Sequence, residues 1–183
     1  MNKKVLFITD SLEDLDLKKD TSILMMEESI KLGFDVYQCL VEDLYAENSE
    51  VIVFAKKITT VSTSEIKFED ASTHSIKTFE YSFMRKDPPV DEDYINALHL
   101  LGLAQAMGTK VFNNPVSIKE FNEKVFAIHF AKYIPETLIS SKIDKIKRFI
   151  KDKKEIVVKP LDGMGGKSIY KMDKIQDLSL IHI

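Results

Sequence analysis

The chain has 183 residues, of which 44% are hydrophobic and 30% are charged, a balance that is typical of a folded, soluble protein and excludes a disordered one. Its 26 Lys and Arg residues against 29 Asp and Glu residues leave a formal charge of −3, so we expect no nucleic acid as a partner. The single cysteine, Cys39, favours a reducing, cytoplasmic location, and since no apolar segment approaches the roughly 20 residues of a membrane helix, we expect no membrane association.

The first 40 residues predict a strand, a helix and a second strand. The wholly apolar run at 5–8 is typical of a strand that is buried on both faces, and residues 35–39 predict the next strand. Between them, Asp20 is a suitable N-cap for a helix that ends near Gly33. Strand, helix and strand in this order indicate a doubly wound α/β domain with a parallel sheet, which is a Rossmann-like architecture.

The segment up to residue 113 predicts short strands and one helix. Acidic residues from Asp91 onward favour a helix N-terminus, and the apolar stripe that follows predicts a helix that ends at Gly108. The expected strands are 50–55, 66–68, 81–84 and 110–113, with hairpins and exposed loop between 59 and 75.

A capping box at Ser117 and Glu120, followed by apolar residues at helical spacing, predicts one helix over 117–131. The hydrophobic pattern changes at Pro135, and the length of the chain predicts one domain and a fraction of a second. We therefore place a domain boundary inside this helix. Beyond it we expect a strand at 137–140, an amphipathic helix at 141–152 with Ile143, Ile146 and Ile150 inward, and strands at 156–159 and 168–171.

A glycine-rich loop joins the last two expected strands. It contains Gly163, Gly165 and Gly166, which are half of the six glycines in the chain. Clustered backbone N–H groups of such a loop can hold phosphate oxygens, but the glycine spacing is that of neither a P-loop nor a dinucleotide fingerprint. Two interpretations stay open, a flap over a triphosphate and a flexible turn.

Two lysines bear on that choice. Alternation places Lys159 on the same face as Val157, which a nearby anion would explain, although a lysine that reaches water at the rim is the commoner arrangement. Lys124 lies beside the apolar stripe of the helix expected at 117–131. If these two lysines converge near the glycine loop, the three features form a phosphate site.

Two groups of polar and charged residues in the first domain could bind a ligand, one after a strand and one before a helix. Arg85 and Asp87 come after the strand expected at 81–84, at the edge where open α/β sheets bind ligands. Lys18, Asp20 and Ser22 stand before the first helix, whose N-terminus favours an anion. The alternatives are a solvated turn for the first group and a helix cap for Asp20.

Five short segments carry a family resemblance. They read MRKDPP, NNP, NEK, PETL and KPLDGMGG, and they occupy residues 84–89, 113–115, 122–124, 135–138 and 159–166. In order and spacing they resemble the bacterial glutathione synthetases, which are ATP-grasp ligases, from near residue 4 to about residue 174. The implied fold is a Rossmann-like pre-ATP-grasp domain over 1–122, followed by the first part of an ATP-grasp domain over 123–177.

The resemblance implies an activity and partners. ATP would phosphorylate the carboxylate of γ-glutamylcysteine, and the amine of glycine would attack the acyl phosphate, which gives glutathione, ADP and phosphate. Mg²⁺, or Mn²⁺ in its place, is the implied cofactor, and a homo-oligomer is the implied assembly. The implied ATP-binding residues are Lys124, Lys159, Gly163, Gly165 and Gly166, and the implied substrate-binding residues are Arg85, Asp87, Lys18, Asp20 and Ser22.

The resemblance also implies a missing part. The acidic metal ligands of an ATP-grasp site belong to a second half, so we expect no catalytic or metal-binding residue in this chain and expect it to be an inactive fragment. We interpret residues 178–183 as an artificial end, with a divergent native segment as the alternative. The alternative functions are another ATP-grasp peptide ligase and a nucleotide-binding module without catalysis.

Overall fold

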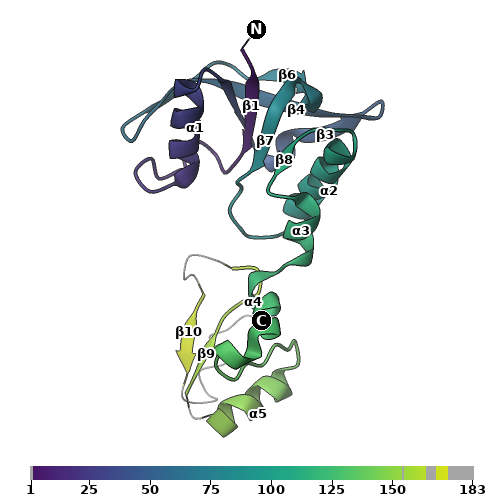
Figure 1. Cartoon of the computed structure of the whole chain (residues 1–183). Helices are drawn as coiled ribbons and strands as arrows, with labels where there is room; N and C mark the ends of the chain where they lie inside the picture. Colours follow the sequence, from purple (N-terminus) through teal and green to yellow (C-terminus); the bar gives the residue numbers. More distant parts are fainter. Residues whose placement is uncertain (1, 154, 164–167, 173–183) are drawn as a thin grey trace. The chain divides into compact units, whose positions relative to one another are not determined.

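The computed structural model describes residues 2–153, 155–163 and 168–172 (Figure 1). They fall into two compact units. The first consists of Met1–Asp87 and Asp91–Glu120, and the second of Pro88–Val90 and Phe121–Ile183.

The first unit contains an eight-stranded sheet whose parallel part has β1 at its centre. The parallel strands are β1 (Lys4–Ile8), β2 (Asp35–Cys39), β7 (Phe79–Met84) and β8 (Val111–Phe112), in the order β2-β1-β7-β8. The antiparallel strands are β3 (Leu44–Glu47), β4 (Glu50–Val61), β5 (Ile66–Phe68) and β6 (Ser72–Ser75). The predicted α/β class and its parallel sheet are confirmed.

The strand β4 is longer than the sequence predicted. It runs through residues that we expected to leave the sheet, because Ile58 and Val61 are buried as well. Val51, Val53 and Ala55 belong to one buried cluster, whereas Ile58 and Val61 belong to the other. It also pairs with four strands, β2, β3, β5 and β6. Such long-range pairing is invisible in local composition, which here is rich in threonine.

Two helices cover opposite faces of this sheet, α1 (Thr21–Lys31) and α2 (Glu92–Ala106) (Figure 1). The alternation of β1 explains how one strand serves both faces. Its side chains Val5 and Phe7 pack in the core that contains α1, whereas Leu6 and Ile8 pack in the core that contains α2. Single turns of 3₁₀ helix occur at η1 (Val41–Asp43) and η2 (Ile76–Thr78).

The single helix predicted over 117–131 is wrong. The structure has α3 (Pro115–Glu120), α4 (Glu123–Phe126) and a 3₁₀ segment, η3 (Ala127–Tyr133). The break falls at Asn122, which has extended backbone angles and whose side chain accepts hydrogen bonds from the N–H groups of Lys124 at 3.0 Å and Val125 at 3.2 Å. An asparagine that satisfies the first amides of a helix starts a new helix there and ends the previous one.

The described part of the second unit contains α5 (Ile143–Lys153) and an antiparallel pair, β9 (Ile156–Val158) and β10 (Tyr170–Met172). Its core consists of buried Ile150 and Met172, with Ile146, Ile156 and Val158 packed against them. Ile143, which we expected inward, is exposed.

Residues 137–140 have no regular structure, so the strand predicted there is wrong. β-branched composition alone does not make a strand, because a strand requires a neighbour with which to pair, and none of the described residues pairs with this segment.

No helix in the described part of the chain is both long and apolar enough to cross a membrane. Apart from Pro88–Val90, the second unit begins at Phe121. The division into 1–122 and 123–177 stays a prediction, and residues 178–183 lie outside the described ranges.

Candidate functional site

The first candidate site lies where the parallel strands β1 and β7 end. Because these strands are neighbours and run in the same direction, the residues that follow them meet at one edge of the sheet. Asp10 follows β1, and Arg85, Lys86 and Asp87 follow β7. The N-terminus of α1 supplies further polar groups at this edge.

Arg85 is tied to both β1 and α1. Its backbone N–H donates to the carbonyl of Ile8 at 2.8 Å, which extends the ladder between the two strands. Its guanidinium donates from Nη2 to Oγ1 of Thr21 at 2.6 Å and from Nε to Oγ of Ser22 at 3.4 Å. Ser22 is buried, and its N–H donates to the carboxylate of Asp20 at 2.7 Å. The structure therefore brings together three of the predicted substrate-binding residues, Arg85, Ser22 and Asp20.

Asp87 lies beside other carboxylates. Its backbone N–H donates to Oδ2 of Asp10 at 3.0 Å. Burial raises the pKa of the Asp87 carboxyl, the negative charges of Asp10 and Asp20 raise it further, and Arg85 and Lys86 act against this rise. A carboxylate in this setting is a suitable partner for a cationic group of a ligand.

Tyr94, near the start of α2, belongs to the same surroundings. Its phenol has a raised pKa because it is buried and because the charges of Asp87 and Asp10 disfavour the phenolate. Neither Tyr94 nor Asp10 was a predicted site residue. The signal for Asp10 was present in the sequence, since it follows a buried strand in the same way as Arg85 follows β7.

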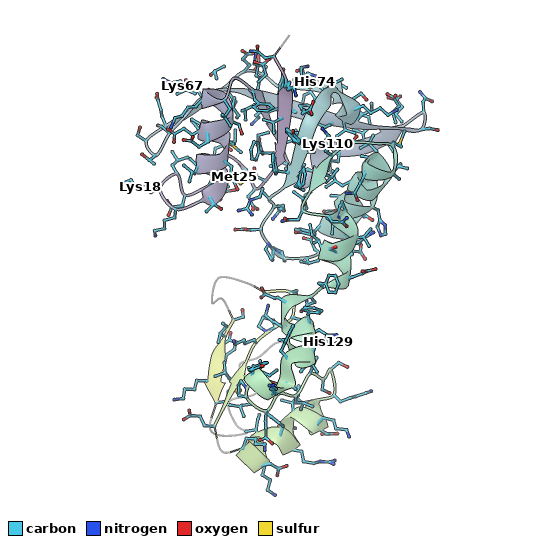
Figure 2. The ribbon with its side chains drawn as sticks, viewed as in Figure 1. Lys18, Met25, Lys67, His74, Lys110 and His129 are labelled. Atoms are coloured by element: carbon cyan, nitrogen blue, oxygen red, sulfur yellow. The ribbon has the colours of Figure 1, made fainter. Side chains whose placement is uncertain are left out.

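Lys18 does not join this group. It is exposed on the turn before α1, where its backbone N–H donates to Asp16, and its side chain lies on the outside of that turn (Figure 2). The alternative interpretation of Asp20, as a helix cap, is confirmed, because Asp20 is the N-cap of α1. A cap role and a ligand role are compatible, because a carboxylate has two oxygens.

The second candidate site lies at the start of the glycine loop. The ammonium group of Lys124 donates to the carbonyl oxygens of Gly163 at 2.7 Å and Leu161 at 3.5 Å, and to Glu123 at 2.9 Å. Next to it, the side-chain amide of Asn122 donates to the carbonyl of Leu161 at 3.0 Å. Of the two lysines whose convergence would form a phosphate site, Lys124 therefore contacts the start of the glycine loop, and the cap of α4 fixes its position.

Lys159 follows β9 directly and is exposed. It shares a face with Val157, whose side chain is 55% exposed, whereas Ile156 and Val158 on the other face pack in the core. Lys159 thus stands on the open face of the hairpin. Gly165 and Gly166 lie outside the described residues, so the structure gives no geometry for that part of the loop.

Cys39 is an inert core thiol. It is almost completely buried, and this burial, with the nearby charges of Asp43 and Glu42, raises the pKa of the thiol.

The fold of the chain is similar to that of D-alanyl-alanine synthetase A from Vibrio cholerae, with a TM-score of 0.55 and 13% sequence identity, over 98% of this chain and 55% of that chain. Residues 3–119 match the model of the prokaryotic glutathione synthetase N-terminal domain, and residues 123–183 match that of the prokaryotic glutathione synthetase ATP-grasp domain. The chain belongs to the prokaryotic glutathione synthetase family, as the five sequence segments predicted.

Individual relatives agree with this assignment. The glutathione synthetase of Vibrio vulnificus strain YJ016 is 34% identical over 171 residues, which are 92% of this chain and 54% of that protein. The glutathione synthetase of Buchnera aphidicola subsp. Schizaphis graminum is 33% identical over 175 residues, which are 94% of this chain and 55% of that protein. The chain spans about half the length of the curated relatives it matches.

Proposed function

We propose that the complete protein joins γ-glutamylcysteine and glycine to form glutathione, with ATP as the energy source. The observation that carries this proposal is that two family models, for the N-terminal domain and for the ATP-grasp domain, match the chain in succession. The contact of Lys124 with the Gly163 carbonyl supports it, because it holds a cation at the start of a glycine-rich loop, and a cation beside such a loop suits a polyphosphate.

The proposed reaction has two steps. The terminal phosphoryl group of ATP passes to the carboxylate of the dipeptide, which gives an acyl phosphate and ADP. The amine of glycine then attacks the acyl carbon, phosphate leaves, and the nitrogen loses a proton. Such a reaction depends on positioning and on charge stabilisation, so it needs no protein nucleophile.

The residues of the second unit serve ATP in this proposal. Lys124 and Lys159 neutralise phosphate oxygens, and the segment from Gly163 to Gly166 covers the phosphates with backbone N–H groups. When a phosphate arrives, it must displace one of the acceptors that now occupy the ammonium group of Lys124. Two of these acceptors are backbone carbonyls, and the third is the carboxylate of Glu123, whose side chain is 77% exposed. Glu123 is the group we expect to leave.

The residues of the first unit serve the dipeptide. Arg85 takes a carboxylate and Asp87 takes the α-ammonium group, since these are the charges that γ-glutamylcysteine carries at neutral pH. Asp20 and Ser22 support Arg85 through the N-terminus of α1. Lys18, on the outer side of its turn, remains a further candidate that would have to reach the ligand by a change in its side chain.

The family implies Mg²⁺, or Mn²⁺ in its place. Among residues 2–153, 155–163 and 168–172, no three His, Cys, Asp or Glu side chains are grouped in a way that could hold a metal ion. As the resemblance implies, we expect those ligands in a second half of the ATP-grasp domain.

The test uses the product of the complete open reading frame. Phosphate release is measured with ATP, γ-glutamylcysteine and glycine together, and with each one omitted. We expect release that requires all three, and no release above background would contradict the proposal. Other amines in place of glycine test the alternative of a peptide ligase with a different acceptor.

Two further experiments complete the test. Lys159→Ala in the complete protein should raise the ATP concentration needed for half-maximal rate, and unchanged kinetics would contradict its role. Titration of the 183-residue chain with ATP tests the alternative of a binding module, which tight, magnesium-dependent binding would favour. Cytoplasmic location and a homo-oligomer are also parts of the proposal, to be checked by cell fractionation and by light scattering.

A further inference from the structure

The carboxylate of Asp10 holds two consecutive residues of the loop after β7. Its Oδ1 lies 2.6 Å from the ammonium nitrogen of Lys86, and its Oδ2 accepts the backbone N–H of Asp87 at 3.0 Å. Both side chains of the ion pair are largely shielded, with 19% of Lys86 and 31% of Asp10 exposed. Lys86 in turn donates to the backbone carbonyl of Asp87 at 2.8 Å.

Asp10 is itself held in place by the neighbouring strands. The buried side chain of Gln38, on β2, donates to the carbonyl of Asp10 at 3.3 Å and to the hydroxyl of Thr9 at 3.1 Å. The hydroxyl of Thr9 donates to the same carbonyl at 2.7 Å. The sheet therefore determines the position of Asp10, and Asp10 determines the position of the loop.

A second ion pair at the opposite end of β7 shows what is particular to Asp10. Glu80 lies 2.7 Å from the ammonium nitrogen of Lys110, whose side chain is 55% exposed, and 3.8 Å from that of Lys3. That pair joins side chains alone, and its lysine is mostly in solvent, where such contacts contribute little. The two carboxylates are about equally shielded, with 28% of Glu80 and 31% of Asp10 exposed, but Asp10 pairs with the less exposed Lys86 and also accepts a backbone N–H. Loss of Asp10 therefore leaves both the loop amide and a shielded ammonium group without the carboxylate.

We propose that Asp10 is a positioning residue for peptide-substrate binding. Each of its oxygens holds a group of the loop after β7, so it acts on the substrate through that loop. By fixing Lys86 and the backbone of Asp87, it holds the carboxylate of Asp87 and the guanidinium of Arg85 at the separation that the dipeptide requires. This inference rests on the proposed function.

The experiment compares three variants of the complete protein with a matched control. Asp10→Ala removes both contacts, and Asp10→Asn keeps an oxygen for the Asp87 N–H but loses the charge. Lys86→Met removes the ion pair together with the hydrogen bond from Lys86 to the Asp87 carbonyl, and leaves the contact of Asp10 with the Asp87 N–H. The control, Glu80→Gln, removes the ion pair at the other end of the same strand. For each protein, kcat, the KM for γ-glutamylcysteine, the KM for ATP and the Tm are measured.

We expect Asp10→Ala to raise the KM for γ-glutamylcysteine by about tenfold or more, because a displaced binding group loses most of its contact energy with the substrate. The KM for ATP should stay within about twofold of the wild-type value. Asp10→Asn should lie between Asp10→Ala and the wild type, and Glu80→Gln should match the wild type. An unchanged KM for the dipeptide in Asp10→Ala would overturn the inference. Equal rises in both KM values with a lowered Tm would also overturn it, since they indicate a merely structural role.

A readout without turnover separates this inference from the proposed function. If the wild-type protein releases no phosphate with these substrates, the proposed function fails, but amide exchange in the 183-residue chain still tests the positioning role. Asp10→Ala should accelerate hydrogen exchange at the amide of Asp87, whereas Glu80→Gln should not. Unchanged exchange at Asp87 in Asp10→Ala would overturn the inference.

Discussion

The ammonium nitrogen of Lys124 lies 2.7 Å from the carbonyl oxygen of Gly163, a residue that is 39 positions further along the chain. This contact joins the first turn of α4 to the start of the glycine loop. Only 21% of the Lys124 side chain is exposed, so the ammonium group is held near the loop and is not a freely moving surface charge. In the proposed function, this ammonium group is the cation that meets a phosphate of ATP.

Replacement of Lys124 should weaken ATP binding selectively. In the complete protein we expect Lys124→Met to raise the KM for ATP by about tenfold or more, because the charge-assisted hydrogen bond to phosphate is lost. Steady-state kinetics with varied ATP provide the measurement. The KM for γ-glutamylcysteine should stay near that of the wild type.

The control for this prediction is Lys151→Met, which removes a lysine that is exposed on α5. It should leave both KM values unchanged. If Lys124→Met and Lys151→Met behave alike, the assignment of Lys124 to ATP is wrong.

Asn122 should stabilise α4 and the loop by two separable contacts. Its side-chain oxygen caps α4, and its amide donates to the carbonyl of Leu161. Asn122→Ala removes both and should destabilise this segment by about 1 kcal/mol. Asn122→Asp keeps the capping oxygen but loses the donor to Leu161.

Hydrogen exchange distinguishes these two contributions. In Asn122→Ala the amides of Lys124 and Val125 should exchange faster, whereas in Asn122→Asp they should keep their protection. Equal protection in wild type and Asn122→Ala would show that the cap does not stabilise α4.

Asp20 should stabilise α1 as a cap independently of any ligand role. Asp20→Ala loses the acceptor for the Ser22 N–H, and we expect a cost of about 1 kcal/mol in the stability of the first unit. Asp20→Asn, which retains a capping oxygen, should cost much less. Urea unfolding of the 183-residue chain, followed by exchange at the amides of α1, gives the measurement.

The same pair of variants tests the substrate role of Asp20. If Asp20→Asn retains stability but raises the KM for γ-glutamylcysteine in the complete protein, the charge serves the ligand. An unchanged KM would assign Asp20 to the cap alone.

Asp87 should titrate above its ordinary value of 3.8, because burial and the charges of Asp10 and Asp20 disfavour its ionised form. The pKa of Asp87 is higher in the folded than in the unfolded state, so the ionised carboxylate is less favourable in the folded protein. The contribution of Asp87 to the free energy of unfolding is therefore fully present below pH 3.8, and it is lost as the pH rises through the folded-state pKa. Asp87→Asn should therefore be slightly more stable than wild type at pH 7, by less than about 1 kcal/mol for this partly exposed group.

NMR titration of the Asp87 carboxyl carbon measures this pKa directly. A midpoint at or below 3.8 would contradict the prediction. Asp10→Asn removes one of the neighbouring charges and should lower the midpoint, whereas Glu80→Gln, at the far end of β7, should leave it unchanged.

Some features of the protein could be predicted from the sequence because they depend on neighbours along the chain. Residue type and local spacing predict three features of the first unit. They are the burial of β1 on both faces, the cap of α1 at Asp20, and the end of α1 near Gly33, which has a φ of +83°. The family, too, was evident from five short segments in the correct order. Local patterns sufficed because each one reports a backbone conformation or a chemically constrained motif.

Other features were decided by contacts between distant residues. The twelve-residue strand β4 forms because four other strands pair with it. At 137–140, where we predicted a strand, no described residue pairs with the chain, and no strand forms. The capping box at Ser117 indicated one long helix, but Asn122 competes for the same backbone amides and starts α4. The ion pair of Asp10 with Lys86, 76 residues away, depends on the parallel pairing of β1 and β7, since the geometry of a sheet edge is a property of the tertiary structure.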